Sequence, residues 1–191
     1  INTFSIISFI SLILIVFIKT NTAMAASSTV TRISGANRYE TAANLAASIW
    51  TTNDNVVLVN GSSYADSINA SVLAKKLDAP VLFTTQFSLD ESTKLALDKL
   101  KPKKIYIIGG TGVISMEIRN ELKNYGYNLV ELGGANRYDT NLSAAKELVS
   151  LGANKDNIFI VNGEGYSDAL SIASIAASKN GILLFVNNNL G

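Results

Sequence analysis

Short apolar runs alternate with amphipathic segments along most of the chain. From Ala42 to Trp50, apolar side chains recur at i, i+3, i+4, i+7 and i+8, which is the spacing of one helical face. Val56–Val59 is a short apolar run rich in β-branched residues, typical of a strand that is covered on both faces. The alternation of these two patterns predicts a βαβα arrangement.

The same patterns predict the remaining elements. Strands are expected at residues 30–33, 56–59, 81–83, 105–108 and 128–132, and helices at residues 42–50, 66–77, 88–100 and 115–123. Because helices of this length join the strands, we expect the strands to run parallel. The predicted fold class is α/β, with open, mainly parallel sheets of the Rossmann, flavodoxin or Toprim-like kind and helices on both faces.

Three signals mark the predicted helix ends. Asp66 precedes a helical run and is expected to be its N-cap. Ser88-Leu89-Asp90-Glu91 has the pattern of a capping box that opens the next helix. Pro102 is expected to end that helix after Leu100.

The chain repeats itself. Gly35-Ala36-Asn37-Arg38-Tyr39-Glu40-Thr41 returns 99 positions later as Gly134-Ala135-Asn136-Arg137-Tyr138-Asp139-Thr140, and later blocks return after 102 positions. A period of this length corresponds to a whole α/β unit. The second copy has no counterpart of residues 86–127, so we expect a truncated second unit and a chain that is part of a longer protein.

The N-terminal residues have a different character. Phe4–Ile18 is almost wholly apolar, and Ala23-Met24-Ala25 supplies small residues in an A-x-A arrangement. This pattern predicts a signal peptide over residues 1–25, rather than a stable transmembrane anchor, because the apolar run is short. The predicted domains are the signal peptide (1–25), a first repeat (26–128) and an incomplete second repeat (129–191).

The composition excludes several kinds of catalytic and metal-binding site. The chain contains no Cys and no His, which excludes a Cys nucleophile, a Ser-His-Asp triad and a Cys/His zinc site. Removing residues 1–25 takes away Lys19 and leaves 15 basic and 15 acidic residues, so no global charge attracts nucleic acid. We expect no cofactor, no metal and no nucleic-acid partner.

Several blocks follow one another in a fixed order. In the first copy they are Arg32–Ala42, Asn60-Gly61 with Tyr64-Ala65-Asp66, Ala79–Phe83 and Ile105–Gly112, and all but the last have counterparts in the second copy. With these blocks, residues 30–191 resemble the cell wall binding type 2 repeat of exported Gram-positive proteins, which include clostridial surface-layer proteins and modifiers of wall amidases. The resemblance implies non-covalent anchoring to anionic wall polymers and three repeats packed as a pseudo-threefold trimer. Glu131 in the second copy matches Arg32 in the first and departs from the pattern.

The duplicated block supplies the predicted polymer-binding residues. An Arg binds phosphate or carboxylate with a planar fork, a helix N-terminus attracts anions, and a Tyr stacks on a sugar face. The candidates are Asn37, Arg38, Tyr39, Asn136, Arg137 and Tyr138.

A structural alternative stands beside each candidate. Arg38 would then pair with Glu40 or another carboxylate, and Tyr39 would pack at the edge of the core. Repetition does not separate the two interpretations, because a turn that defines the fold repeats as well.

Two other motifs favour structural roles. Gly109-Gly110-Thr111-Gly112 follows a strand as phosphate loops do, but it lacks their full spacing and is interpreted as a tight turn with positive φ. Asp66 and Asp168 follow strands where ligands often bind, yet helix capping is the better interpretation.

The prediction is therefore a binding module, not an enzyme, in a secreted protein at the cell wall or cell surface. Its expected partners are an anionic wall polymer or peptidoglycan-associated glycan and neighbouring repeats of the same chain. Two alternatives remain open. One is the N-terminal targeting part of a wall hydrolase of the N-acetylmuramoyl-L-alanine amidase type, and the other is a structural surface-layer or adhesion component.

Overall fold

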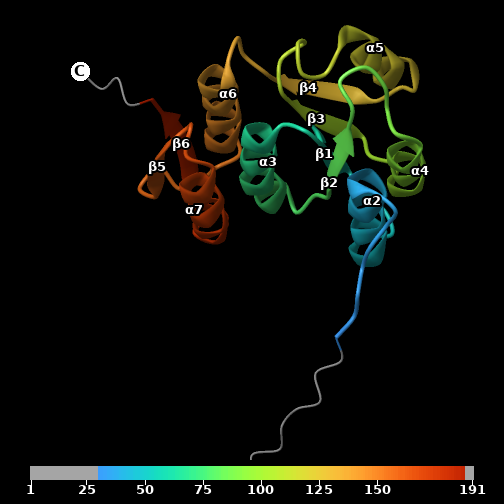
Figure 1. Cartoon of the computed structure of the whole chain (residues 1–191), viewed down its shortest axis with the longest axis horizontal. Coiled ribbons are helices and arrows are strands. Elements are labelled where there is room, and N and C mark those ends of the chain that lie inside the picture. Colours follow the sequence, from blue (N-terminus) through green and yellow to red (C-terminus); the bar gives the residue numbers. More distant parts are fainter. Residues whose placement is uncertain (1–29, 188–191) are drawn as a thin grey trace, which may run out of the picture. The chain divides into compact units, whose positions relative to one another are not determined.

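The computed structural model describes residues 30–187 (Figure 1). The chain divides into two units between Arg32 and Ile33, and every helix and strand described here lies in the second. The signal peptide predicted for residues 1–25 lies outside the described residues. Within residues 30–187, no helix is both long enough and apolar enough to cross a bilayer.

Helices and strands alternate along the second unit. The helices are α2 (Arg38–Ile49), α3 (Tyr64–Leu77), α4 (Glu91–Leu100), α5 (Met116–Asn124), α6 (Arg137–Ser150) and α7 (Tyr166–Ser178). The strands are β1 (Asn55–Asn60), β2 (Val81–Thr84), β3 (Lys104–Ile108), β4 (Asn128–Leu132), β5 (Ile158–Asn162) and β6 (Ile182–Val186).

The strands form two parallel sheets. The first has the order β2-β1-β3-β4, and its register places Val57 of β1 beside Val81 of β2 and Tyr106 of β3. The second pairs β5 with β6. The predicted α/β class with mainly parallel sheets is confirmed.

Alternating residues of β1 supply two separate cores. Val57 and Val59 pack with α3, α6 and α7, whereas Val56 and Leu58 pack with α2, α4 and α5 on the other face. All four side chains are fully buried. The apolar run at residues 56–59 thus reflects a strand with helices on both faces.

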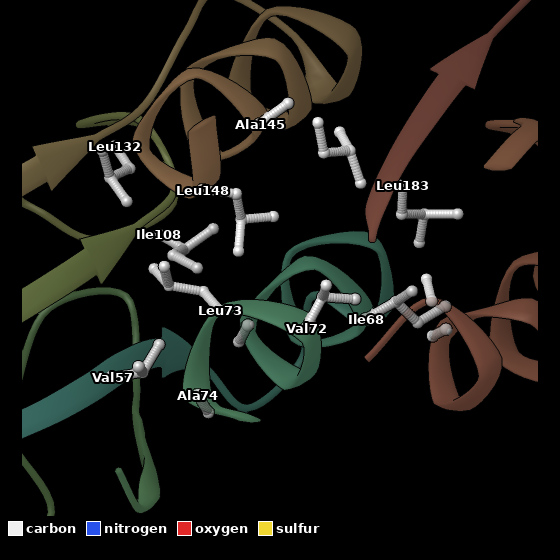
Figure 2. Packing of buried hydrophobic residues seen from close by; sticks show 14 of the residues in the cluster. Val57, Ile68, Val72, Leu73, Ala74, Ile108, Leu132, Ala145, Leu148 and Leu183 are labelled. Carbon is white, nitrogen blue, oxygen red and sulfur yellow. The ribbon is translucent and has the colours of Figure 1, made fainter. Parts of the chain in front are cut away.

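Helix α3 lies between the two repeats. It packs against β1 on one side and against α6 and α7 on the other (Figure 1). Figure 2 shows the α3 side chains Ile68, Val72 and Leu73 among those of the first sheet, α6 and β6. Because the helix is covered on several sides, its buried residues are spread around much of its circumference.

Strand β4 joins the repeats covalently and by hydrogen bonding. By sequence it opens the second repeat, yet it pairs with β3 of the first, with Glu131 beside Ile107. The second repeat therefore begins inside the sheet of the first.

A buried polar contact fixes α6 on the edge of β6. The Asn141 side-chain Nδ2 donates to Leu183 O (2.9 Å) and to Asn69 Oδ1 of α3 (2.7 Å), and Phe185 N donates to Asn141 Oδ1 (2.8 Å). Asn141 thereby satisfies two backbone groups at the strand edge as a neighbouring strand would. The equivalent residue of the first repeat, Ala42, has no side chain able to do this.

The strand predicted at residues 30–33 is wrong, since these residues are exposed and form no strand. Their second-copy counterpart is β4, which owes its strand conformation to pairing with β3. Among the described residues, both sides of β3 are taken by β1 and β4. A β pattern without a partner edge cannot form a ladder.

Two predicted helix caps are also wrong. Helix α3 starts at Tyr64 with Ser63 as N-cap, which leaves Asp66 inside the first turn. Helix α4 is capped by Asp90, whose side chain accepts from Ser92 N (2.9 Å), while Ser88 belongs to the preceding turn. The predicted end at Leu100 before Pro102 is confirmed, with Lys101 in the left-handed conformation.

We expect Asn141→Ala to lower the free energy of unfolding by about 2–4 kcal/mol, because Leu183 O and Phe185 N lose their buried partner. Thermal unfolding followed by circular dichroism measures the effect. Asn120→Ala makes the same chemical change at an exposed position of α5 and serves as the control. Equal melting temperatures for the two variants would show that the contact does not stabilise the fold.

Candidate functional site

A cavity with a volume of ≈ 450 Å³ lies at the carboxyl edge of the four-stranded sheet. Both repeats line it: the segments that follow β1, β2 and β3, and the start of α6. Its residues are Asn60, Ser62, Ser63, Tyr64, Ala65, Asp66, Gln86, Gly110, Gly112, Val113, Gly134, Ala135, Asn136, Arg137 and Thr140. This edge is where ligands of open parallel sheets bind.

Asn60 organises the floor of the cavity. Its Nδ2 donates to Val113 O (2.7 Å), and its Oδ1 accepts from Ser62 N (2.8 Å). One side chain thus closes the turn after β1 and ties it to the loop after β3. The strand-ending turn predicted at Asn60-Gly61 is confirmed.

Asp66 is a buried carboxylate at this cavity. Ser63 Oγ donates to Asp66 Oδ2 (2.7 Å) and accepts no hydrogen bond from a backbone N–H of α3. Burial raises the pKa of the Asp66 carboxyl, and the Ser63 hydrogen bond and the charge of Arg137 oppose that rise. Asp66 thus lies at the ligand-binding edge of the sheet, and the capping role predicted for it is not observed.

Arg137 spans the two repeats. Its Nη1 donates to Tyr64 OH (2.6 Å) and to Gly163 O (2.9 Å), and it lies 3.4 Å from Glu164 Oε2. The guanidinium carbon sits 5.4 Å from the centre of the Tyr64 ring, within cation–π range. The aromatic surface continues to Tyr166, whose ring meets that of Tyr64 edge to face at 5.3 Å.

The first copy of the block has different surroundings. Arg38 Nη1 donates to Gly61 O, the counterpart of the Arg137 contact with Gly163. The Arg–Gly contact is thus a repeated element of the fold, made to a backbone carbonyl rather than to the carboxylate that the structural alternative expected. The specific pairing of Arg38 with Glu40 does not form, because Glu40 Oε2 accepts from Ala36 N instead. Only the second copy of the block lines the cavity.

Asn37 and Asn136 are N-caps. Their Oδ1 atoms accept from the backbone N–H groups of Tyr39 and Glu40, and of Tyr138 and Asp139, all at 2.9 Å. These side chains occupy the first N–H groups of α2 and α6, which were predicted to bind an anion. Helix α3 has no side-chain cap, so its first turn is the better anion-binding terminus at this cavity.

Tyr39 and Tyr138 are partly buried rather than open platforms. Tyr138 packs against the core around α3, and its hydroxyl donates to Glu164 Oε1 (3.0 Å). Glu164 therefore contacts both Arg137 and Tyr138. The aromatic ring that lies at the cavity is that of Tyr64, which belongs to one of the repeated blocks but was not among the predicted polymer-binding residues.

The glycine turn after β3 forms one wall. Gly109 has a φ of 128°, which confirms the predicted turn with positive φ. A Cβ on Gly110 would lie 2.7 Å from Gly134 O, so the absence of a side chain allows the two repeats to approach. Among residues 30–187, no three His, Cys, Asp or Glu side chains group as metal ligands would.

The residues that sequence reasoning missed share one signal. Asn60, Tyr64 and Gln86 follow the ends of neighbouring strands, and parallel strands bring their carboxyl ends to one edge. The strand order was needed to join that edge to Arg137, which is 77 residues from Asn60 in sequence.

Several known proteins are similar to this chain in sequence or in fold. A family model described as Cell wall binding domain 2 (CWB2) matches residues 32–119 and 131–190. N-acetylmuramoyl-L-alanine amidase LytC of Bacillus subtilis (strain 168) is 37% identical over 174 residues, covering 91% of this chain and 34% of LytC. The Amidase enhancer of the same organism is 40% identical over 147 residues, covering 77% of this chain and 20% of that protein.

A solved structure agrees. Cwp6 from Clostridium difficile superposes with a TM-score of 0.76 at 32% sequence identity, covering 88% of this chain and 28% of that chain. The chain thus spans about a third or less of the length of these relatives. The family is described by wall binding rather than by catalysis, which agrees with a binding module at the cell wall. Since the matched segments cover most of both repeats, the chain belongs to the Cell wall binding domain 2 family.

Proposed function

We propose that this chain anchors a secreted protein to the cell wall non-covalently, by holding an anionic wall polymer in the cavity between the repeats. One observation carries the proposal: Arg137 of the second repeat lies over Tyr64 of the first, where both line a cavity of ≈ 450 Å³. The arrangement places a cation and an aromatic ring side by side at a site of ligand size.

The chemistry of the lining suits a sugar polymer with phosphate or carboxylate groups. The Arg137 guanidinium and the uncapped first turn of α3 attract an anionic group. Tyr64 offers a ring face or edge to a sugar, and Asn60, Ser62 and Gln86 add polar groups. Asp66 opposes the binding of anions when it is ionised.

The proposal retains Asn136 and Arg137 from the predicted polymer-binding residues and adds Tyr64. Asn37, Arg38, Tyr39 and Tyr138 do not line this cavity, so the proposed site leaves these four predicted polymer contacts out. Multiple weak sites along one protein would raise overall affinity through effective concentration.

Wall hydrolysis is not proposed for this chain. LytC is named an amidase, but the match covers only 34% of it. Amidases that use zinc need His ligands, and the chain has none. A targeting role within a larger hydrolase or surface-layer protein is compatible with the proposed anchoring.

We expect the full chain to co-sediment with purified Gram-positive cell walls and to lose this binding when the anionic polymer is chemically stripped. Binding should weaken as salt is raised, because the proposed contacts are charged. Pelleting assays with intact and stripped walls measure both effects. Equal pelleting with stripped walls would exclude the polymer as the ligand.

Arg137→Ala is expected to weaken wall binding by about 10-fold or more, since a charge-assisted contact contributes roughly 1.5–3 kcal/mol. Arg38→Ala is the matched control, because it removes the equivalent Arg–Gly carbonyl contact away from the cavity. Its effect on binding should stay below about 3-fold, given the lack of a cavity contact. Similar losses in both variants, at similar melting temperatures, would refute the assignment of the cavity.

Binding should also depend on pH through Asp66. Its raised pKa means that the folded protein holds the proton more strongly than the unfolded chain does. The stability that this difference provides is present below the ordinary pKa of 3.8 and is lost as pH rises through the raised value. A phosphodiester polymer should therefore bind more tightly as pH falls from 7 toward that value. Asp66→Asn should bind about 3- to 10-fold more tightly at pH 7, by removing an opposing charge.

Isothermal titration with a phosphodiester wall polymer at several pH values measures this dependence, because phosphodiesters keep their charge in the range tested. The Asp66→Asn chain should show a flat profile. If the variant kept the pH dependence of the unsubstituted chain, Asp66 would not be the group that controls binding.

A further inference from the structure

A buried arginine lies at the junction between the repeats. Arg119 of α5 is 2% exposed, and its Nη2 donates to Gly109 O (2.8 Å) and its Nε to Ile114 O (3.2 Å). Its Nη1 donates to Glu131 Oε2 of β4 (2.7 Å). A buried cation is costly unless it is paired and fully hydrogen-bonded, so Arg119 depends on the carboxylate that β4 supplies.

Glu131 is held as an anion in this position. Lys123 of α5 lies 3.1 Å from its other oxygen. Burial alone would raise the pKa of Glu131, but the hydrogen bond from Lys123 and the charges of Arg119 and Lys123 outweigh it and lower that pKa. The last helix of the first repeat thus presents two cations to the leading strand of the second.

The leading segment of the first repeat carries the opposite charge at the same place. Counting back from the duplicated glycines Gly35 and Gly134, Arg32 stands where Glu131 stands. An Arg32-bearing strand on the β3 edge would therefore set a second guanidinium against Arg119, without the carboxylate that the burial of Arg119 requires.

Steric fit, as well as charge, prevents residues 30–34 from taking the place of β4 beside β3. Ser34 is the counterpart of Gly133, and a Cβ on Gly133 would lie 2.8 Å from Gly109 O and 3.0 Å from Gly110 Cα. Those atoms belong to the backbone, so moving them aside would distort the turn after β3. Two independent features thus exclude the first leading segment from the edge that accepts the second.

We infer that the Arg119–Glu131 pair is a charge code that selects which leading segment joins which sheet edge. Residues 30–34 fit the edge of a different unit of this fold, one with Asp or Glu in the position of Arg119 and more room at the position of Gly109. The exposure of Val30 (93%) and Ile33 (38%) agrees with a segment whose partner strand is absent from residues 30–187.

The code has a consequence for assembly. If the leading segment of one molecule replaced β4 of another, Arg32 would meet Arg119 and Ser34 would meet Gly109 O. The chain thereby disfavours exchange between identical copies and preserves the order of its repeats.

A transplant of the first leading strand onto the β3 edge of the full chain tests the inference. The combination L129V/V130T/E131R/L132I reproduces residues 30–33, and L129V/V130T/L132I is the matched control that keeps Glu131. Each is made with Arg119 intact and with R119E, and thermal unfolding is compared across the four chains.

With Arg119 intact, the E131R transplant should melt at least about 5 °C below its control, because it breaks a buried ion pair. With R119E the order should invert, since the transplanted cation then meets a carboxylate. The same order in both backgrounds, or equal melting within each, would overturn the inference.

R119Q keeps the inference testable if the R119E chains fail to fold. A neutral side chain removes the clash of cations, so the difference between transplant and control should shrink to less than half of that seen with Arg119. An undiminished difference in R119Q would show that charge complementarity at this position does not select the strand.

Discussion

The packing of α3 between the two repeats is the contact on which the rest of the structure depends. Ile68, Val72 and Leu73 are each at most 4% exposed, and they face the first sheet, α6 and the second sheet within one cluster (Figure 2). Fully burying a side chain of this kind contributes about 1.5–3 kcal/mol. Parallel sheets need such cover on both faces, and α3 gives it to β1 while providing the surface on which the second repeat rests.

Apolar packing of this kind brings the repeats together but tolerates alternative alignments, whereas the polar contacts around it do not. Asn141 must meet Asn69, Glu131 must meet Arg119, and Arg137 must reach Tyr64. Each contact pairs a group of one repeat with a group of the other, and a buried group that misses its partner is penalised. These contacts fix the alignment of the two repeats against each other. They occur where the two copies of the repeat differ or meet different neighbours.

The candidate binding site also depends on the packing of the two repeats against each other. The carboxyl ends of β1, β2 and β3 form its floor, and the close approach of Gly110 to Gly134 O brings the start of α6 over it. The identical Asn-Arg-Tyr triplets consequently acquire different surroundings, since Arg137 lines a cavity and Arg38 does not. A repeated motif therefore marks a repeated fold element, while its contribution to a site depends on what the preceding repeat places beside it.

The sequence by itself determined the parts of the protein that depend on local pattern: the repeat, the α/β class, most strands and helices, and the positive φ of Gly109. These follow from periodicity and backbone preferences over a few residues. Only the tertiary structure decided that Asp66 lies inside a helix beside a cavity, that Val30–Ile33 has no ladder, and that Arg137 rather than Arg38 meets Tyr64. The reason is that strand pairing, burial and cavity lining join residues that are distant in the sequence, such as Tyr64 and Arg137, and no local pattern states which of two equivalent segments finds a partner.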